Sequence, residues 1–125
     1  MRYTIIICCS LLLFSCQKEP IEPSIEGVWV WHATLGGVVD IFETPESTGR
    51  TEMVYITDSK IKFYYNDSLY QSKDYILVKA QSIRGYKTNQ IHFDDGMSMS
   101  YRFVNDHLHL FEERSDTLTH VYHPY

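Results

Sequence analysis

Cysteine is scarce in this chain, and its three cysteines all lie within the first 16 of 125 residues. Because residues 17–125 contain no thiol, they can form neither a disulfide nor a cysteine-based metal or catalytic site. Runs of about five to eight basic residues are absent as well. With a formal net charge of −5, the chain lacks the positive surface that nucleic-acid binding requires, so the sequence predicts no nucleic-acid partner.

The common catalytic motifs are also missing. The sequence contains no Gly-x-Ser-x-Gly, no His-Glu-x-x-His, no phosphate-binding loop and no dinucleotide fingerprint. The acidic pairs Asp94-Asp95 and Glu112-Glu113 adjoin turns, and adjacent residues of a strand point to opposite faces, so neither pair predicts an acid/base site. The sequence therefore predicts a noncatalytic protein, and a hydrolase or isomerase built around His120 is the minority alternative.

The N-terminus has the anatomy of an export signal. Arg2 precedes an apolar run over residues 5–14, and a run of about ten residues is typical of a signal peptide and too short to span a bilayer. The residues Leu13-Phe14-Ser15-Cys16 resemble the lipobox of bacterial lipoproteins. This resemblance implies that residues 1–15 are removed and that Cys16 carries the lipid that anchors the protein to a membrane. An ordinary secreted protein cleaved near Ser15 is the alternative.

Residues 16–24 form the expected link between anchor and domain. Two prolines and several charges in "QKEPIEPS" favour an extended tether. The residue after Cys16 is Gln17. By resemblance to lipoprotein sorting rules an Asp there would favour the inner membrane, so we expect the outer membrane. The tether leaves residues 25–125 as one domain.

The domain itself has the pattern of an all-β protein, because aromatic and β-branched residues alternate with polar ones between turn-forming clusters. Eight short strands predict a closed up-and-down β-barrel, with a β-sandwich as the alternative. The expected strands cover residues 27–35, 50–57, 60–65, 69–78, 90–94, 97–104, 107–112 and 118–123.

Two turns fix the expected register of neighbouring strands. A three-residue Asp94-Asp95-Gly96 turn pairs Ile91 with Met99, which puts the apolar rows of both strands on one face. A two-residue turn at Asn105 and Asp106 continues that face by pairing Phe103 with Leu108 and Tyr101 with Leu110. The side chains expected to point outward are those of Ser98, Ser100, Arg102, His107 and His109.

Gly27-Val28-Trp29 resembles the Gly-x-Trp signature of the lipocalin and fatty-acid-binding superfamily. With the expected strands that follow, residues 25–125 look like the small lipocalin-like lipoproteins of Gram-negative bacteria. The resemblance implies a barrel into which the first strand turns its tryptophans. The chain is shorter than a full lipocalin and shows no C-terminal helix, which weighs against a deep cavity.

Large side chains are expected to fill or line the barrel. They either form a solid core, since an eight-stranded barrel is barely wide enough for its own side chains, or bind a small hydrophobic or glycan-like ligand. His120 shares a face with Leu118 and Tyr122, where it is a hydrogen-bonded core residue or orients the ligand. The candidate ligand-binding residues are Trp29, Trp31, Phe63, Tyr65, Met99, Tyr101, His120 and Tyr122.

Six histidines raise the question of a metal site. His107 and His109 share a strand face, as a zinc site could use, but the expected register sets Arg102 opposite His109, where its charge opposes a cation. The sequence therefore predicts no metal ligands and no cofactor besides the lipid on Cys16.

The long connection over residues 36–49 is expected to cover the barrel mouth, with Val38, Val39, Ile41 and Phe42 turned inward. Asp40 and Glu43 have the spacing of a helix capping box.

These observations predict a membrane-anchored, noncatalytic lipocalin-like lipoprotein that either binds a small hydrophobic or glycan-like ligand or has a solidly packed interior. The alternative is an assembly accessory with a filled barrel whose outer surface contacts other proteins of the cell envelope.

Overall fold

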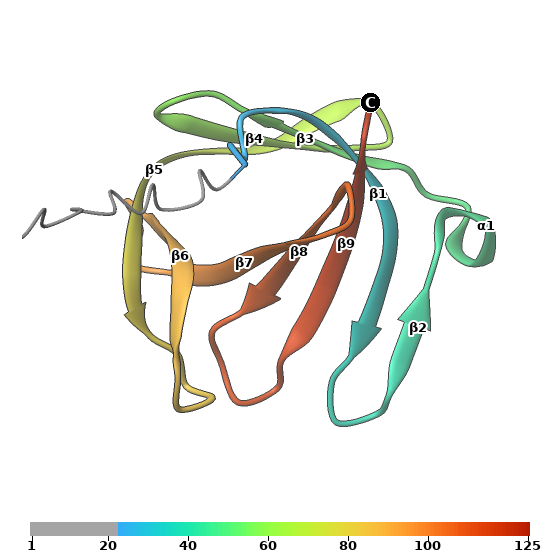
Figure 1. Ribbon diagram of the computed structural model, residues 1–125. Helices are drawn as coiled ribbons and strands as arrows, with labels where there is room; N and C mark the ends of the chain where they lie inside the picture. Colours follow the sequence, from blue (N-terminus) through green and yellow to red (C-terminus); the bar gives the residue numbers. More distant parts are fainter. Residues whose placement is uncertain (1–22) are drawn as a thin grey trace, which may run out of the picture.

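In the computed structural model, which describes residues 23–125, one antiparallel sheet closes on itself (Figure 1). From β3 to β9 each strand pairs with the next one in the sequence, β1 pairs with both β2 and β3, and β9 returns to pair with β1. The strands are β1 (Gly27–Gly36), β2 (Ile41–Glu43), β3 (Glu52–Ile56), β4 (Lys60–Tyr65), β5 (Ser68–Gln81), β6 (Lys87–Phe93), β7 (Ser98–Val104), β8 (His107–Glu112) and β9 (Leu118–Pro124).

Nine strands occupy eight positions around the barrel, because β2 and β3 pair with successive parts of the same edge of β1. The short helix α1 (Pro45–Thr48) interrupts them. The predicted eight-stranded up-and-down barrel is therefore confirmed, and the pairing of β1 with β9 leaves no role for the sandwich alternative. Helix α1 is also far too short to cross a membrane, and no helix in residues 23–125 is long and apolar enough to do so.

The predicted register is confirmed at both turns. Ile91 pairs with Met99, and the left-handed Gly96 forms the turn between their strands. Tyr101 pairs with Leu110 across the next turn, where Asn105 also has a positive φ. The apolar rows of β6, β7 and β8 consequently face the interior together.

Strands β5 and β6 are longer than predicted. Strand β5 continues to Gln81 and β6 begins at Lys87, although both segments are rich in polar residues. The first part of β5 pairs with β4 and the second with β6, so this strand bends from one part of the barrel wall to the next (Figure 1).

The expected inward lid over residues 36–49 is wrong. The segment forms a hairpin of β1 and β2, and Val38, Val39 and Phe42 are 86%, 83% and 70% exposed. The capping box belongs to Thr44 and Ser47 rather than to Asp40 and Glu43. The backbone pairing of β2 with β1 explains why the loop is exposed, because it holds the loop at the edge of the barrel instead of across its mouth.

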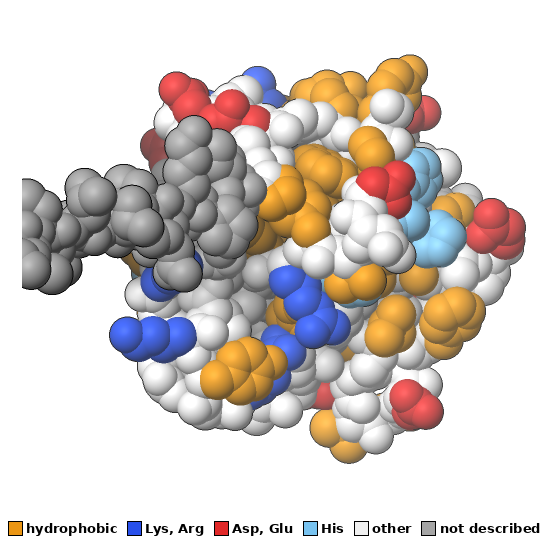
Figure 2. Space-filling view, in the orientation of Figure 1, with side chains coloured by type: hydrophobic (Ala, Val, Ile, Leu, Met, Phe, Trp, Pro, Cys, Tyr) orange, Lys and Arg blue, Asp and Glu red, His pale blue; other side chains and the backbone are white. Residues whose placement is uncertain are grey.

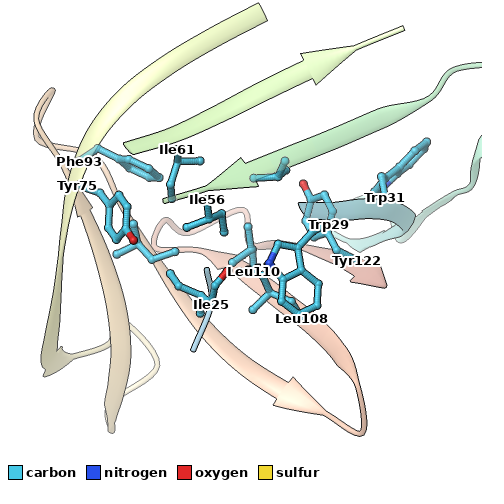
Figure 3. Packing of buried hydrophobic residues seen from close by; sticks show 12 residues of the cluster. Ile25, Trp29, Trp31, Ile56, Ile61, Tyr75, Phe93, Leu108, Leu110 and Tyr122 are labelled. Carbon is cyan, nitrogen blue, oxygen red and sulfur yellow. Dashed lines mark hydrogen bonds between the residues drawn. The ribbon is translucent and has the colours of Figure 1, made fainter. Parts of the chain in front are cut away.

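The members of the buried core cluster that lie away from the cavity fill one end of the barrel; they include Ile25, Trp29, Ile56, Leu108 and Leu110 (Figure 3). Ile25 is 2% exposed within the core cluster, and its backbone carbonyl accepts a hydrogen bond of 2.7 Å from the Trp29 indole. The side chain of Trp29 also contacts Phe103, with ring centres 5.8 Å apart. The segment that enters the barrel therefore closes this end.

A polar network fastens the outer surface. Glu113 accepts hydrogen bonds from Ser82, from the Ile83 N–H and from Ser100. Burial acts to raise the pKa of Glu113, but these hydrogen bonds together hold it below its usual value. Ser100 points outward as predicted, yet it is only 2% exposed because it is part of this network. The network ties the turn between β5 and β6 to the end of β8.

Candidate functional site

The other end of the barrel contains a cavity of about 700 Å³. Its apolar wall includes Val54, Phe63, Phe93, Met99 and Tyr122. The mouth is formed by exposed side chains, among them Tyr70, Gln71 and Met97. The interior is thus packed at one end and hollow at the other, so neither of the two expected interiors describes the whole barrel.

Five of the eight candidate residues lie in the cavity wall: Phe63, Tyr65, Met99, His120 and Tyr122. The other three lie elsewhere. Trp29 belongs to the packed end, and Tyr101 packs against the core beside Leu110. Trp31 is 1% exposed and is covered by the Arg50 guanidinium, which lies 4.7 Å from the centre of its ring.

His120 is held by a chain of hydrogen bonds at the polar end of the cavity. The Trp31 indole donates to the Thr34 hydroxyl oxygen at 2.9 Å, and the same oxygen lies 2.9 Å from Nδ1 of His120. On the other side of the ring, Nε2 lies 3.2 Å from a carboxylate oxygen of Glu112. A neutral imidazole protonated at Nε2 gives each member of this chain a hydrogen-bond partner. The Thr34 hydroxyl then donates to Nδ1, and Nε2 donates to Glu112.

This network limits the chemistry open to His120. Both ring nitrogens already have partners, so the imidazole can act as a base toward a ligand only if it gives one of them up. The arrangement favours the sequence interpretation of His120 as a hydrogen-bonded, positioned side chain.

Arg50 is the second polar feature of the cavity. Its guanidinium lies 3.0 Å from Glu43 and 3.3 Å from Glu52. Burial raises the pKa of Glu52 above its usual value, against the opposing effects of Arg50 and His120. Glu52 thus lies where burial opposes its charge and the neighbouring Arg50 supports it.

Each cationic side chain in the cavity wall is paired with a carboxylate. Besides Arg50, Lys73 lies 2.7 Å from Asp95, and Arg114 lies 2.6 Å from Glu112. The cavity therefore combines an apolar wall with hydrogen-bonding groups whose charges are compensated.

Sequence reasoning missed Arg50, Glu52 and Glu112. A signal for the two acids was present, because Glu52 alternates in phase with Val54 and Ile56, and Glu112 with Leu108 and Leu110. A charged residue two positions from an inward-facing residue of the same strand also points into the barrel. Arg50 has the same phase at the start of the expected strand over residues 50–57, although it reaches the cavity from the segment between α1 and β3.

No family model matches the chain, and no match was found among curated proteins or solved structures. The barrel architecture therefore rests on the strand pairing described above.

Replacement of Thr34 by Val tests the hydrogen-bond chain. The substitution keeps the shape of the side chain but leaves the buried Trp31 indole without its acceptor, so we expect a loss of about 1 to 3 kcal/mol in the free energy of unfolding. Denaturant unfolding followed by tryptophan fluorescence measures it. Thr119→Val, on the outer face of β9, is the matched control with an expected change within about 0.5 kcal/mol. Equal stability of both variants would contradict the network.

Proposed function

We propose that the protein is a noncatalytic, lipid-anchored, lipocalin-like barrel that binds a small amphipathic ligand. The observation that carries the proposal is the cavity of about 700 Å³ at one end of a barrel whose other end is packed. Ligand-binding cavities typically measure about 300 to 1,000 Å³ and combine apolar walls with a few polar groups. The lipocalin-like classification is supported by the Gly-x-Trp start of β1 and by the strand order.

The charges of the cavity favour a neutral ligand. Arg50, Lys73 and Arg114 each have a carboxylate partner, so a charged head group would have to compete with an existing ion pair. A hydroxyl-bearing head can instead share hydrogen bonds with Glu52 and with the His120 network. The apolar part of the ligand would then lie against Phe63, Phe93 and Met99, removed from water.

A second candidate function is that of an accessory protein in the cell envelope. The exposed apolar side chains of Val38, Val39 and Phe42 at the hairpin of β1 and β2 favour it, because such groups are common where proteins meet. This function needs no ligand in the barrel, so a cavity-blocking variant separates the two proposals.

The proposed location is the outer membrane, through a lipid on Cys16. The signal segment, the lipobox and most of the tether lie outside the described residues, so this part of the proposal rests on the sequence pattern. A chain carrying two or more acyl groups is held durably at a membrane, whereas a single short chain binds only marginally.

Blocking the cavity mouth tests the ligand-binding proposal. We expect the neutral fluorescent probe N-phenyl-1-naphthylamine to bind saturably to the protein, with enhanced emission. Gln71→Trp places a bulky ring at the mouth and should weaken binding by at least about tenfold, since the probe must displace it. Ser72→Trp, which faces outward on the same strand, should change affinity by less than about twofold. Absence of saturable binding, or equal weakening by both variants, would contradict a ligand site in the barrel.

Replacement of Cys16 by Ala tests the anchor. The variant should lose palmitate labelling and move from the membrane fraction to the soluble fraction, because the lipid has no attachment atom. Cys9→Ala removes a thiol from the predicted signal segment and should leave both properties unchanged. Retention of labelled Cys16→Ala protein in the membrane fraction would show that the lipobox interpretation is wrong.

A further inference from the structure

Three histidines from distant parts of the sequence meet on the outer surface of the barrel. The ring centres of His32 and His107 lie 5.5 Å apart, those of His32 and His123 6.1 Å, and those of His107 and His123 6.4 Å. The three rings meet edge to face, and Figure 2 shows histidine side chains gathered on the side of the molecule where β1 lies. We call these three residues the histidine cluster.

Closure of the barrel creates the cluster. His123 pairs with Val30 of β1, and the pairing of Leu108 with Tyr122 sets His107 beside His123 on the outer face. His32 lies at a β-bulge, between the paired residues Trp31 and Ala33, and has no partner of its own in the ladder with β9. Bulges often re-aim a side chain, and this one adds a third imidazole to a pair that the strand register already provides.

Two members of the cluster each have a hydrogen-bond acceptor beside Nδ1. Nδ1 of His107 lies 2.8 Å from the Asp106 carboxylate, and Nδ1 of His123 lies 3.0 Å from the backbone carbonyl of Pro124. Both partners are acceptors, so each Nδ1 carries the proton and the lone pair of the neutral ring is on Nε2. Metal-binding histidines commonly donate their other N–H to a carboxylate or carbonyl in this manner.

The charged groups around the cluster also favour a cation. The Asp106 carboxylate lies against His107, and Glu46 of α1 is close enough to His32 for the two to interact electrostatically. The pKa of Glu46 is lowered mainly by hydrogen bonds from its own backbone N–H and from Thr44, and His32 adds a smaller effect in the same direction. Arg102, by contrast, pairs across the strands with His109, which is not a member of the cluster.

The rings of the cluster must rotate before they can bind one ion together. In residues 23–125 no three donor side chains stand ready around a common point. Three imidazoles that bind Zn²⁺ at about 2.0 Å in tetrahedral geometry have ring centres about 5 Å apart, against 5.5 to 6.4 Å in the cluster. The side chains are at the surface, so they can close this gap without disturbing the core.

We propose that His32, His107 and His123 form a surface site for a divalent transition-metal ion of the zinc and copper type. These ions favour imidazole ligands. Three protein ligands leave a fourth position for water or for the Glu46 carboxylate. The sequence predicted no metal ligands after the pair of His107 and His109 was considered, so this site is a new proposal, which shares only His107 with that pair.

Calorimetric titration of the full chain with Zn²⁺, after treatment with a chelator, tests the site. We expect one ion to bind at the cluster, and His32→Gln, His107→Gln and His123→Gln each to weaken that binding by at least about tenfold. His109→Gln is the matched control, since it removes a histidine from the same outer face of β8, and it should change affinity by less than about twofold. The N-terminal cysteines are common to all variants and cannot produce this difference.

Copper gives an independent readout of the ligands. Electron paramagnetic resonance of the Cu²⁺ complex should show coupling to three nitrogens in the wild-type chain and to two in His123→Gln. Thermal unfolding of the metal-free proteins should be unchanged by the substitutions, which separates a lost ligand from a damaged fold. Zn²⁺ affinity that is equal in the wild type, His107→Gln and His109→Gln, or a Cu²⁺ signal with fewer than three nitrogens, would overturn the proposal.

Discussion

The pairing of β1 with β9 is the constraint on which the rest of the structure depends. It joins the first strand of the domain to the last and leaves the sheet without open edges at this position. On the inner face it sets Thr34 opposite His120 and Trp31 opposite Tyr122, which builds the polar end of the cavity. On the outer face it sets His123 beside β1, where the bulge at His32 completes the histidine cluster. The pairing of β1 with β9 therefore contributes to both sites proposed for this protein.

The interior is asymmetric because the two ends of the barrel are closed differently. At one end Ile25 enters the core and its carbonyl binds the Trp29 indole, so the entering chain fills the space. At the other end the connection between β1 and β2 stays at the edge of the barrel, and nothing comparable fills the interior in residues 23–125. The charged groups left there lie in ion pairs, as between Arg50 and Glu52, which lets charged side chains remain beside an apolar wall.

The sequence predicted the fold where local chemistry decides the structure. A turn at Gly96 fixes the register of two strands, so the pairing of Ile91 with Met99 could be derived from the alternation of apolar residues. The prediction that Val38 and its neighbours turn into the barrel was wrong, because a sequence does not distinguish an exposed apolar side chain from a buried one. The histidine cluster joins residues 32, 107 and 123, and only barrel closure and a bulge bring them together. No local pattern carries that information.

Methyl NMR under xenon pressure tests most directly the central claim that the barrel is packed at one end and hollow at the other. Xenon enters apolar cavities but not close-packed cores. The account predicts a saturable shift of the Met99 methyl resonance, which lies in the cavity wall, and no shift for the methyl groups of Ile25 and Leu108 in the packed end. Equal responses at both ends, or no response at Met99, would contradict it.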